Sequence, residues 1–104
     1  MTHAELKTLL ATTTLPVVYR AWETDEPSLP YIVFIATGSD NFVADNRVYH
    51  KRTPVDVELY TRDKSPDTEF AVEAVLDSVP IVWTKNETYL EDEKCFEIIY
   101  GIEV

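Results

Sequence analysis

Apolar and polar positions follow two different periods along this chain, and the first of them predicts an N-terminal helix. Three leucines fall at the i, i+3 and i+4 spacing that shares one helical face: Leu6, Leu9 and Leu10. Thr2 is a candidate N-cap, and Glu5 three residues later completes a capping-box pattern. Pro16 ends the helix, because the residue before a proline disfavours helical geometry. The leucine face is expected to pack on the core.

The second period, of two residues, predicts strands. Residues 17–22 (VVYRAW) are rich in β-branched and aromatic side chains, and residues 31–36 (YIVFIA) are continuously apolar, which fits a strand buried on both faces. Residues 47–61 form the next extended region, in which Val55, Val57 and Leu59 alternate with polar positions. The last strand, 95–104, places five apolar residues on one face: Phe96, Ile98, Tyr100, Ile102 and Val104.

A second helix begins after residues 62–64. Ser65 is the expected cap, Pro66 takes the first helical position, and acidic Asp67 and Glu69 suit the positive end of the helix dipole. The predicted apolar stripe of this helix is Phe70, Ala71, Ala74 and Val75. Beyond Pro80, residues 81–85 (IVWTK) are predicted as a strand, followed by a turn at residues 86–87.

The resulting order, α-β-β-β-α-β-β, predicts an α+β fold: a mostly antiparallel sheet of four to five strands with two helices on one face. The length of 104 residues fits a single domain over residues 1–104. Residues 37–52 stand out as a displayed loop. They carry two sets of turn chemistry around Phe42 and Val43, and they exceed what a hairpin connection needs.

Composition and charge narrow the class of protein. The chain has nine Lys and Arg against nineteen Asp and Glu, a net charge of −10, so nucleic-acid phosphate is repelled and conventional nucleic-acid binding is not expected. The acidic charge either keeps the protein soluble or forms a surface along which nucleic acid passes without binding. Composition does not distinguish these two interpretations. No apolar run approaches the ~18 residues of a membrane helix, and the N-terminus has no basic region typical of a secretory signal. The chain is expected to fold in a cytoplasm, with its single Cys95 as a structural residue.

The sequence has no set of residues whose spacing matches a known catalytic or metal-binding motif. Ser39, His50 and Asp45 can be written as a triad, but no nucleophile elbow or oxyanion glycine accompanies them. The pairs at residues 40–41 and 45–46 lack the glycine and glutamate of a calcium loop and read better as turns. Two glycines in all exclude glycine-rich phosphate loops. We therefore expect no enzyme, no cofactor and no metal.

Arg47, Lys51 and Arg52 form the densest basic cluster of the chain. One interpretation is ordinary pairing with acidic residues across strands. The other is an electrostatic seam, in which the basic segment of one subunit meets an acidic face of the next. Such a contact is heterologous and closes into a ring if the rotation allows.

The pattern as a whole resembles a known family. The closest marks are Leu29-Pro30-Tyr31, Ser39-Asp40-Asn41-Phe42, Asp45-Asn46 with Val48-Tyr49, and Glu58-Leu59-Tyr60, followed by AVEAVLD and the closing FEIIYGIEV. These resemble small head–tail joining proteins of long-tailed phages of Gram-positive bacteria, labelled minor capsid, tail completion or tail terminator proteins. The resemblance covers most of the chain, and its motifs are structural.

The resemblance implies a tail-terminator-like fold and a ring, typically a hexamer, at the head-proximal end of the tail in the virion. The implied partners are other copies of the chain, the tail tube protein and the head connector proteins, while DNA passes through without specific binding. The contact residues are then expected on the loop: Asp40, Asn41, Phe42, Val43, Asp45, Arg47, Lys51 and Arg52. The alternative is a monomeric acidic binding or regulatory module that mimics nucleic acid.

Overall fold

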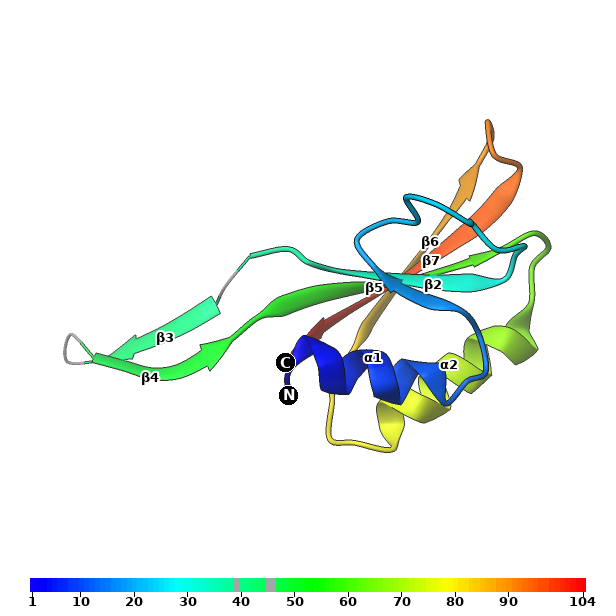
Figure 1. Ribbon diagram of the computed structural model, residues 1–104. Coiled ribbons are helices and arrows are strands. Elements are labelled where there is room, and N and C mark those ends of the chain that lie inside the picture. The colour runs from blue at the N-terminus through cyan, green and yellow to red at the C-terminus, as the bar shows by residue number, and fades with distance from the viewer. Residues whose placement is uncertain (39, 45–46) are drawn as a thin grey trace.

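The computed structural model describes residues 1–38, 40–44 and 47–104, and residues 40–44 and 47–51 by their backbone only. It has two layers, a five-stranded sheet and two helices on one face of that sheet (Figure 1). The elements are α1 (His3–Ala11), β1 (Val17–Tyr19), β2 (Tyr31–Ala36), β3 (Asp40–Ala44), β4 (Arg47–Arg52), β5 (Pro54–Thr61), α2 (Pro66–Asp77), β6 (Thr84–Leu90) and β7 (Cys95–Glu103).

The main sheet has the strand order β1-β2-β5-β7-β6. β1 pairs with β2 in parallel, and the other neighbours are antiparallel. With β3 and β4 set aside, the order along the chain is α-β-β-β-α-β-β, so the predicted α+β class and element order are confirmed. The predicted capping box at Thr2 is also present. The Thr2 hydroxyl accepts a hydrogen bond from the Glu5 amide, and the Glu5 carboxylate accepts one from the Thr2 amide.

One apolar layer between the sheet and the helices forms the core. Alternation along β5 directs Val55, Val57 and Leu59 to the helices, as predicted from the period of two. The remaining buried members come from both helices and from β2 and β7: Leu6, Leu10, Val72, Leu76, Ile32, Phe34, Ile98, Tyr100 and Ile102. The opposite face of the sheet carries no helix (Figure 1).

The predicted apolar stripe of α2 is wrong. Phe70 is 61% exposed, Ala71 and Ala74 are exposed as well, and Val75 is only half-buried. The buried face instead consists of Glu69, Val72 and Leu76. The sequence pattern placed Glu69 in the first turn only as a charge that suits the helix dipole, whereas in the fold its carboxylate is buried and meets two lysines.

Some strand and cap assignments also differ from the predictions. β1 ends at Tyr19 and does not reach residue 22, because Arg20 has φ of 72° and leaves the extended conformation. β6 begins at Thr84 and passes without a turn through residues 86–87, so the reversal lies at residues 91–94. Ser65 occupies the N-cap position, but its hydroxyl bonds Thr68 Oγ1 at 2.7 Å and caps no backbone amide.

The displayed segment predicted at residues 37–52 is present, but most of it is strand and not loop. β3 and β4 form a separate two-stranded sheet that continues β2 and β5 away from the core (Figure 1). We call this hairpin, Asp40–Ala44 with Arg47–Arg52, the arm. It gives the molecule its elongated dimensions of 49 × 27 × 24 Å. In the part of the chain described, no helix is long and apolar enough to cross a membrane.

The corrected face of α2 gives a stability prediction. Leu76→Ala removes a fully buried side chain and should lower the free energy of unfolding by about 2–5 kcal/mol. The control Phe70→Ala, on the exposed face of the same helix, should change it by less than about 0.5 kcal/mol. Urea denaturation followed by circular dichroism measures both, and equal losses would contradict the observed phase of the helix.

Candidate functional site

The arm holds most of the residues that the sequence singled out for partner contact. Four lie on β3 and three on β4: Asp40, Asn41, Phe42 and Val43, then Arg47, Lys51 and Arg52. The eighth, Asp45, lies outside the described residues, as does Ser39. The hypothetical triad of those two residues with His50 therefore has no described geometry.

The backbone register of the arm is antiparallel with one irregularity. Asp40 pairs with Arg52 and Phe42 with His50, whereas Val43 pairs with Val48. The shift between Phe42 and Val43 is a bulge, which bends a hairpin and increases its twist.

At its base the arm is tied to the core by a few polar contacts. Thr53 and Val104 exchange both backbone hydrogen bonds, at 2.9 and 3.0 Å. Arg52 Nη1 lies 3.4 Å from Glu103 Oε2, and both side chains are largely exposed, so this ion pair adds little stability. Among the described strands, β3 and β4 pair only with each other. A lone two-stranded hairpin is marginal in water, so the arm is suited to lie against another surface.

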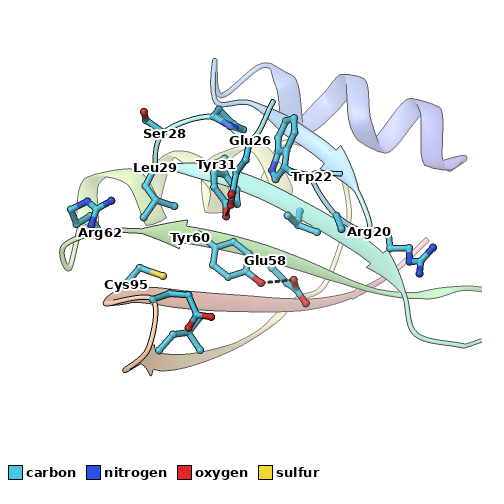
Figure 2. A pocket seen from close by; sticks show the side chains of 15 residues that line it. Arg20, Trp22, Glu26, Ser28, Leu29, Tyr31, Glu58, Tyr60, Arg62 and Cys95 are labelled. Carbon is cyan, nitrogen blue, oxygen red and sulfur yellow. Dashed lines mark hydrogen bonds between the residues drawn. The ribbon is translucent and has the colours of Figure 1, made fainter. Parts of the chain in front are cut away.

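A second candidate lies on the face of the sheet that the helices leave uncovered. Here the segment between β1 and β2 folds over β2 and β5 and borders a cleft of about 560 Å³ (Figure 2). Its aromatic wall is a ladder of three rings, with Trp22 and Tyr31 centroids 5.8 Å apart and Tyr31 and Tyr60 centroids 5.4 Å apart. Arg20 and Arg62 stand at the ends of this cleft, and Cys95 also lines it.

Some polar groups of the cleft have hydrogen-bond partners among the described residues and others do not. The Tyr31 hydroxyl donates to Glu26 Oε1 at 2.7 Å, while the buried Trp22 Nε1 has no hydrogen-bond partner among the described residues. Burial and the nearby Glu93 raise the pKa of the Cys95 thiol, although Arg62 opposes this. The thiol is therefore a poor nucleophile, in agreement with the structural role predicted for it.

Tyr60 lies between two carboxylates beside this cleft. Its hydroxyl is 2.9 Å from Glu58 Oε1 and 2.7 Å from Glu97 Oε2. A phenol has a single proton, so it donates to one carboxylate at a time. Burial raises the pKa of Glu58, and repulsion from Glu97 and Asp56 adds to the shift, while the Tyr60 hydrogen bond opposes it. This cluster of Glu58, Tyr60 and Glu97 has more acceptors than donors.

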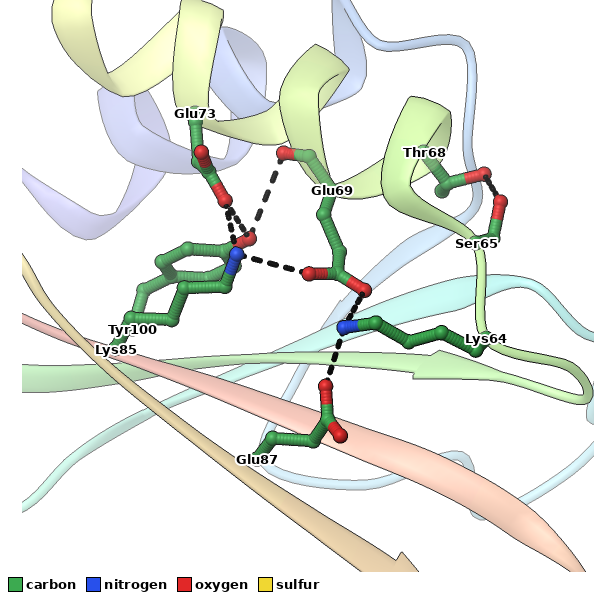
Figure 3. A network of polar contacts seen from close by, with 8 residues as sticks. All are labelled: Lys64, Ser65, Thr68, Glu69, Glu73, Lys85, Glu87 and Tyr100. Atoms are coloured by element: carbon green, nitrogen blue, oxygen red, sulfur yellow. Dashed lines mark hydrogen bonds and ion pairs between the residues drawn. The ribbon is translucent and has the colours of Figure 1, made fainter.

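A separate polar network joins α2 to the edge of the sheet (Figure 3). Glu69, 2% exposed, lies 2.7 Å from Lys64 Nζ and 2.8 Å from Lys85 Nζ. Lys85 also reaches Glu73 at 2.7 Å, and the Tyr100 hydroxyl donates to Glu73 at 2.8 Å. Both carboxylate oxygens of Glu69 are paired, so the network is a structural clamp. Its geometry does not suggest a catalytic site.

The charges of this clamp also act on the pKa of Glu69. Burial pushes the pKa of this carboxyl upward, but the hydrogen bonds and positive charges of Lys64 and Lys85 outweigh burial and lower it. Glu69 is therefore ionised at neutral pH. Among the described residues, no group of three His, Cys, Asp or Glu side chains is placed to hold a metal ion.

Sequence reasoning missed the cleft and the Glu58–Tyr60–Glu97 cluster. The alternation of β5 already placed Glu58 and Tyr60 on its polar face. What it did not supply was the register, since Tyr60 faces Glu97 only through the pairing of β5 with β7.

No protein-family model matches this chain, and a comparison with the curated proteins finds no match.

The clamp gives a pH-dependent prediction. Glu69→Gln should lower the free energy of unfolding by about 2 kcal/mol at pH 7, because it leaves two lysines without their buried counter-charge. Since folding lowers the pKa of Glu69, its stabilisation is present at neutral pH and is lost as the pH falls. The free energies of unfolding of wild type and Glu69→Gln, plotted against pH, should therefore converge below roughly pH 4. The control Glu87→Gln, which alters the 42% exposed partner of Lys64, should cost less than about 1 kcal/mol.

The cluster gives a prediction of opposite sign. Folding raises the pKa of Glu58, so its ionisation opposes folding as the pH rises above the ordinary carboxyl range. Glu58→Gln should therefore match or exceed the wild-type free energy of unfolding at pH 7. Its advantage should shrink as the pH is lowered to about 4. Denaturant titrations across this range provide the test, and a loss of stability at pH 7 that persists at pH 4 would contradict the prediction.

Proposed function

We propose that this chain is a structural protein of the head–tail junction of a long-tailed phage, a tail terminator or tail-to-head joining protein. It assembles as a ring at the head-proximal end of the tail tube. The resemblance of its sequence motifs to that family suggests the role. The observation that carries the proposal is the arm, which projects from the core and, among the described strands, pairs only with itself (Figure 1).

An arm of this kind supports assembly for a physical reason. A two-stranded hairpin alone has little stability in water, and its exposed strand edges favour contact with another chain. When the arm of one copy meets a different surface of the next, the contact is heterologous, and a repeated heterologous contact closes into a ring when the rotation allows. Six copies is the number that the resemblance implies.

Charge supports the same role. A protein with a net charge of −10 repels phosphate, so a ring of such subunits lets DNA pass through its lumen without adhesion. The remaining partners are the tail tube protein on one side of the ring and the head connector proteins on the other. In this proposal the chain carries out no reaction and needs no cofactor.

A second candidate function draws on the uncovered face. A monomeric module that displays carboxylates such as Asp56, Glu58 and Glu97 could occupy the basic surface of a nucleic-acid-binding protein. This alternative predicts binding to such proteins and no affinity for tail tubes. It leaves the projecting arm without a role, so we favour the ring.

The ring proposal is tested on the arm itself. The double variant Phe42→Asp/Arg47→Glu should abolish binding to purified tail tubes and their competence to join heads, because it removes an apolar anchor and reverses a charge. Its melting temperature should stay within a few degrees of wild type, since the arm is not part of the core. Pelleting with tubes and a head-joining assay measure the loss.

A matched control exchanges an aromatic and a basic residue on the helix side of the molecule. Phe70→Asp/Lys7→Glu alters exposed positions of α2 and α1 and should bind tubes as the wild type does. If the wild-type protein neither binds tubes nor gives them joining competence, the ring proposal is wrong. A large loss of thermal stability in the arm variant would show instead that the arm belongs to the core.

A further inference from the structure

The sheet face opposite the helices is acidic over its centre. Core residues of β5 and their cross-strand partners on β7 point to the helices, so the alternate residues point to the uncovered face. Four carboxylates share this face: Asp56, Glu58, Glu97 and Glu103. β2, β5, β6 and β7, all fully described, contribute no Lys or Arg to it, since Lys85 points to the helix side. We call these four residues, with Tyr60, the acidic face.

The centre of the acidic face has more hydrogen-bond acceptors than donors. The single proton of Tyr60 serves Glu58 and Glu97, which lie 2.9 and 2.7 Å from its oxygen. Both carboxylates are partly buried, so water satisfies them incompletely. A guanidinium or ammonium group placed over the cluster would supply donors and compensating charge at once.

The strand β4 carries the opposite charge. Its sequence, RVYHKR, holds three of the nine basic residues of the chain and no acidic residue. The base of the arm already displays the matching chemistry, because Arg52 pairs with Glu103, which belongs to the acidic face. The two surfaces are thus complementary in charge.

Within one chain the remaining basic residues of β4 cannot reach the centre of this face. Glu97 lies six residues before Glu103 on β7, which places it about 20 Å along the strand from the base of the arm. β4 runs from Arg47 toward Arg52, so Arg47 and Lys51 lie still farther out on an arm that points away from the core (Figure 1). A contact between β4 and the centre of this face therefore requires two copies of the chain.

We propose that β4 of one copy docks on the acidic face of a second copy, with its basic side chains over the Glu58–Tyr60–Glu97 cluster. This inference deepens the proposed function, on which it rests, by naming the two surfaces of the subunit contact. The contact is heterologous, because the arm of each copy meets the acidic face of the next copy around the assembly. Tyr60 also belongs to the aromatic ladder with Tyr31 and Trp22, so the proposed docking surface adjoins the cleft.

Charge exchange tests the contact. The arm variant Arg47→Glu/Lys51→Glu and the face variant Glu58→Lys/Glu97→Lys should each raise the concentration needed for assembly at least tenfold, in sedimentation velocity and on tail tubes. Mixed in equal amounts, the two variants should form a complex, because each keeps one native surface and the two altered surfaces are again complementary. The milder Glu58→Gln/Glu97→Gln keeps the inference testable if the reversal impairs folding, and it too should weaken assembly at least tenfold.

Controls and outcomes separate this inference from the proposed function. Lys7→Glu and Asp67→Lys, exposed residues of α1 and α2, should leave assembly unchanged. If the wild type assembles and the folded face variants assemble equally well, the docking surface is wrong while the ring proposal stands. If neither the arm variant nor the face variant assembles alone, and a mixture of the two forms no complex, the direct pairing of the two surfaces is also wrong. If the wild type stays monomeric at all concentrations and does not bind tail tubes, both the docking contact and the ring proposal are wrong.

Discussion

Both helices lie on one face of the five-stranded sheet, and this arrangement shapes the rest of the molecule. All residues of the main core cluster lie between α1, α2 and the helix side of the sheet. The other face is covered over part of its area by the segment between β1 and β2, and its centre displays alternating polar residues (Figure 2). A small chain has too few apolar residues for a third layer, so an uncovered face is the natural consequence of its size.

The clamp around Glu69 fixes how the second helix meets that sheet. A carboxylate that is 2% exposed requires paired cations, and Lys64 and Lys85 supply them from both sides (Figure 3). Removing either partner leaves a charge poorly compensated, so the helix is held in one rotation about its axis. That rotation leaves Phe70 in solvent and buries Val72 and Leu76. The ion pairs of Glu69 and the burial of Val72 and Leu76 therefore require the same rotation of the helix.

The arm and the uncovered face are the parts of the molecule that the core does not explain. The arm contains seven of the eight residues proposed for partner contact, and the face contains the cluster in which Tyr60 serves two carboxylates. In the proposed contact, the basic strand of one copy meets the acidic surface of the next. The proposed ring at the head–tail junction uses both surfaces, and in that proposal the net charge of −10 keeps DNA from adhering.

The sequence by itself determined the class of the fold, the order of the main elements and the capping box, because these depend on local periodicity and on contacts three residues apart. It also located the segment that leaves the core, from its turn residues and its basic cluster. The tertiary structure decided the phase of α2, the start of β6 and the strand character of the arm. It decided the Glu58–Tyr60–Glu97 cluster too, because the pairing of β5 with β7 brings together residues 37 positions apart. Local pattern cannot supply such contacts, since register and ion pairing are set by elements distant in the chain.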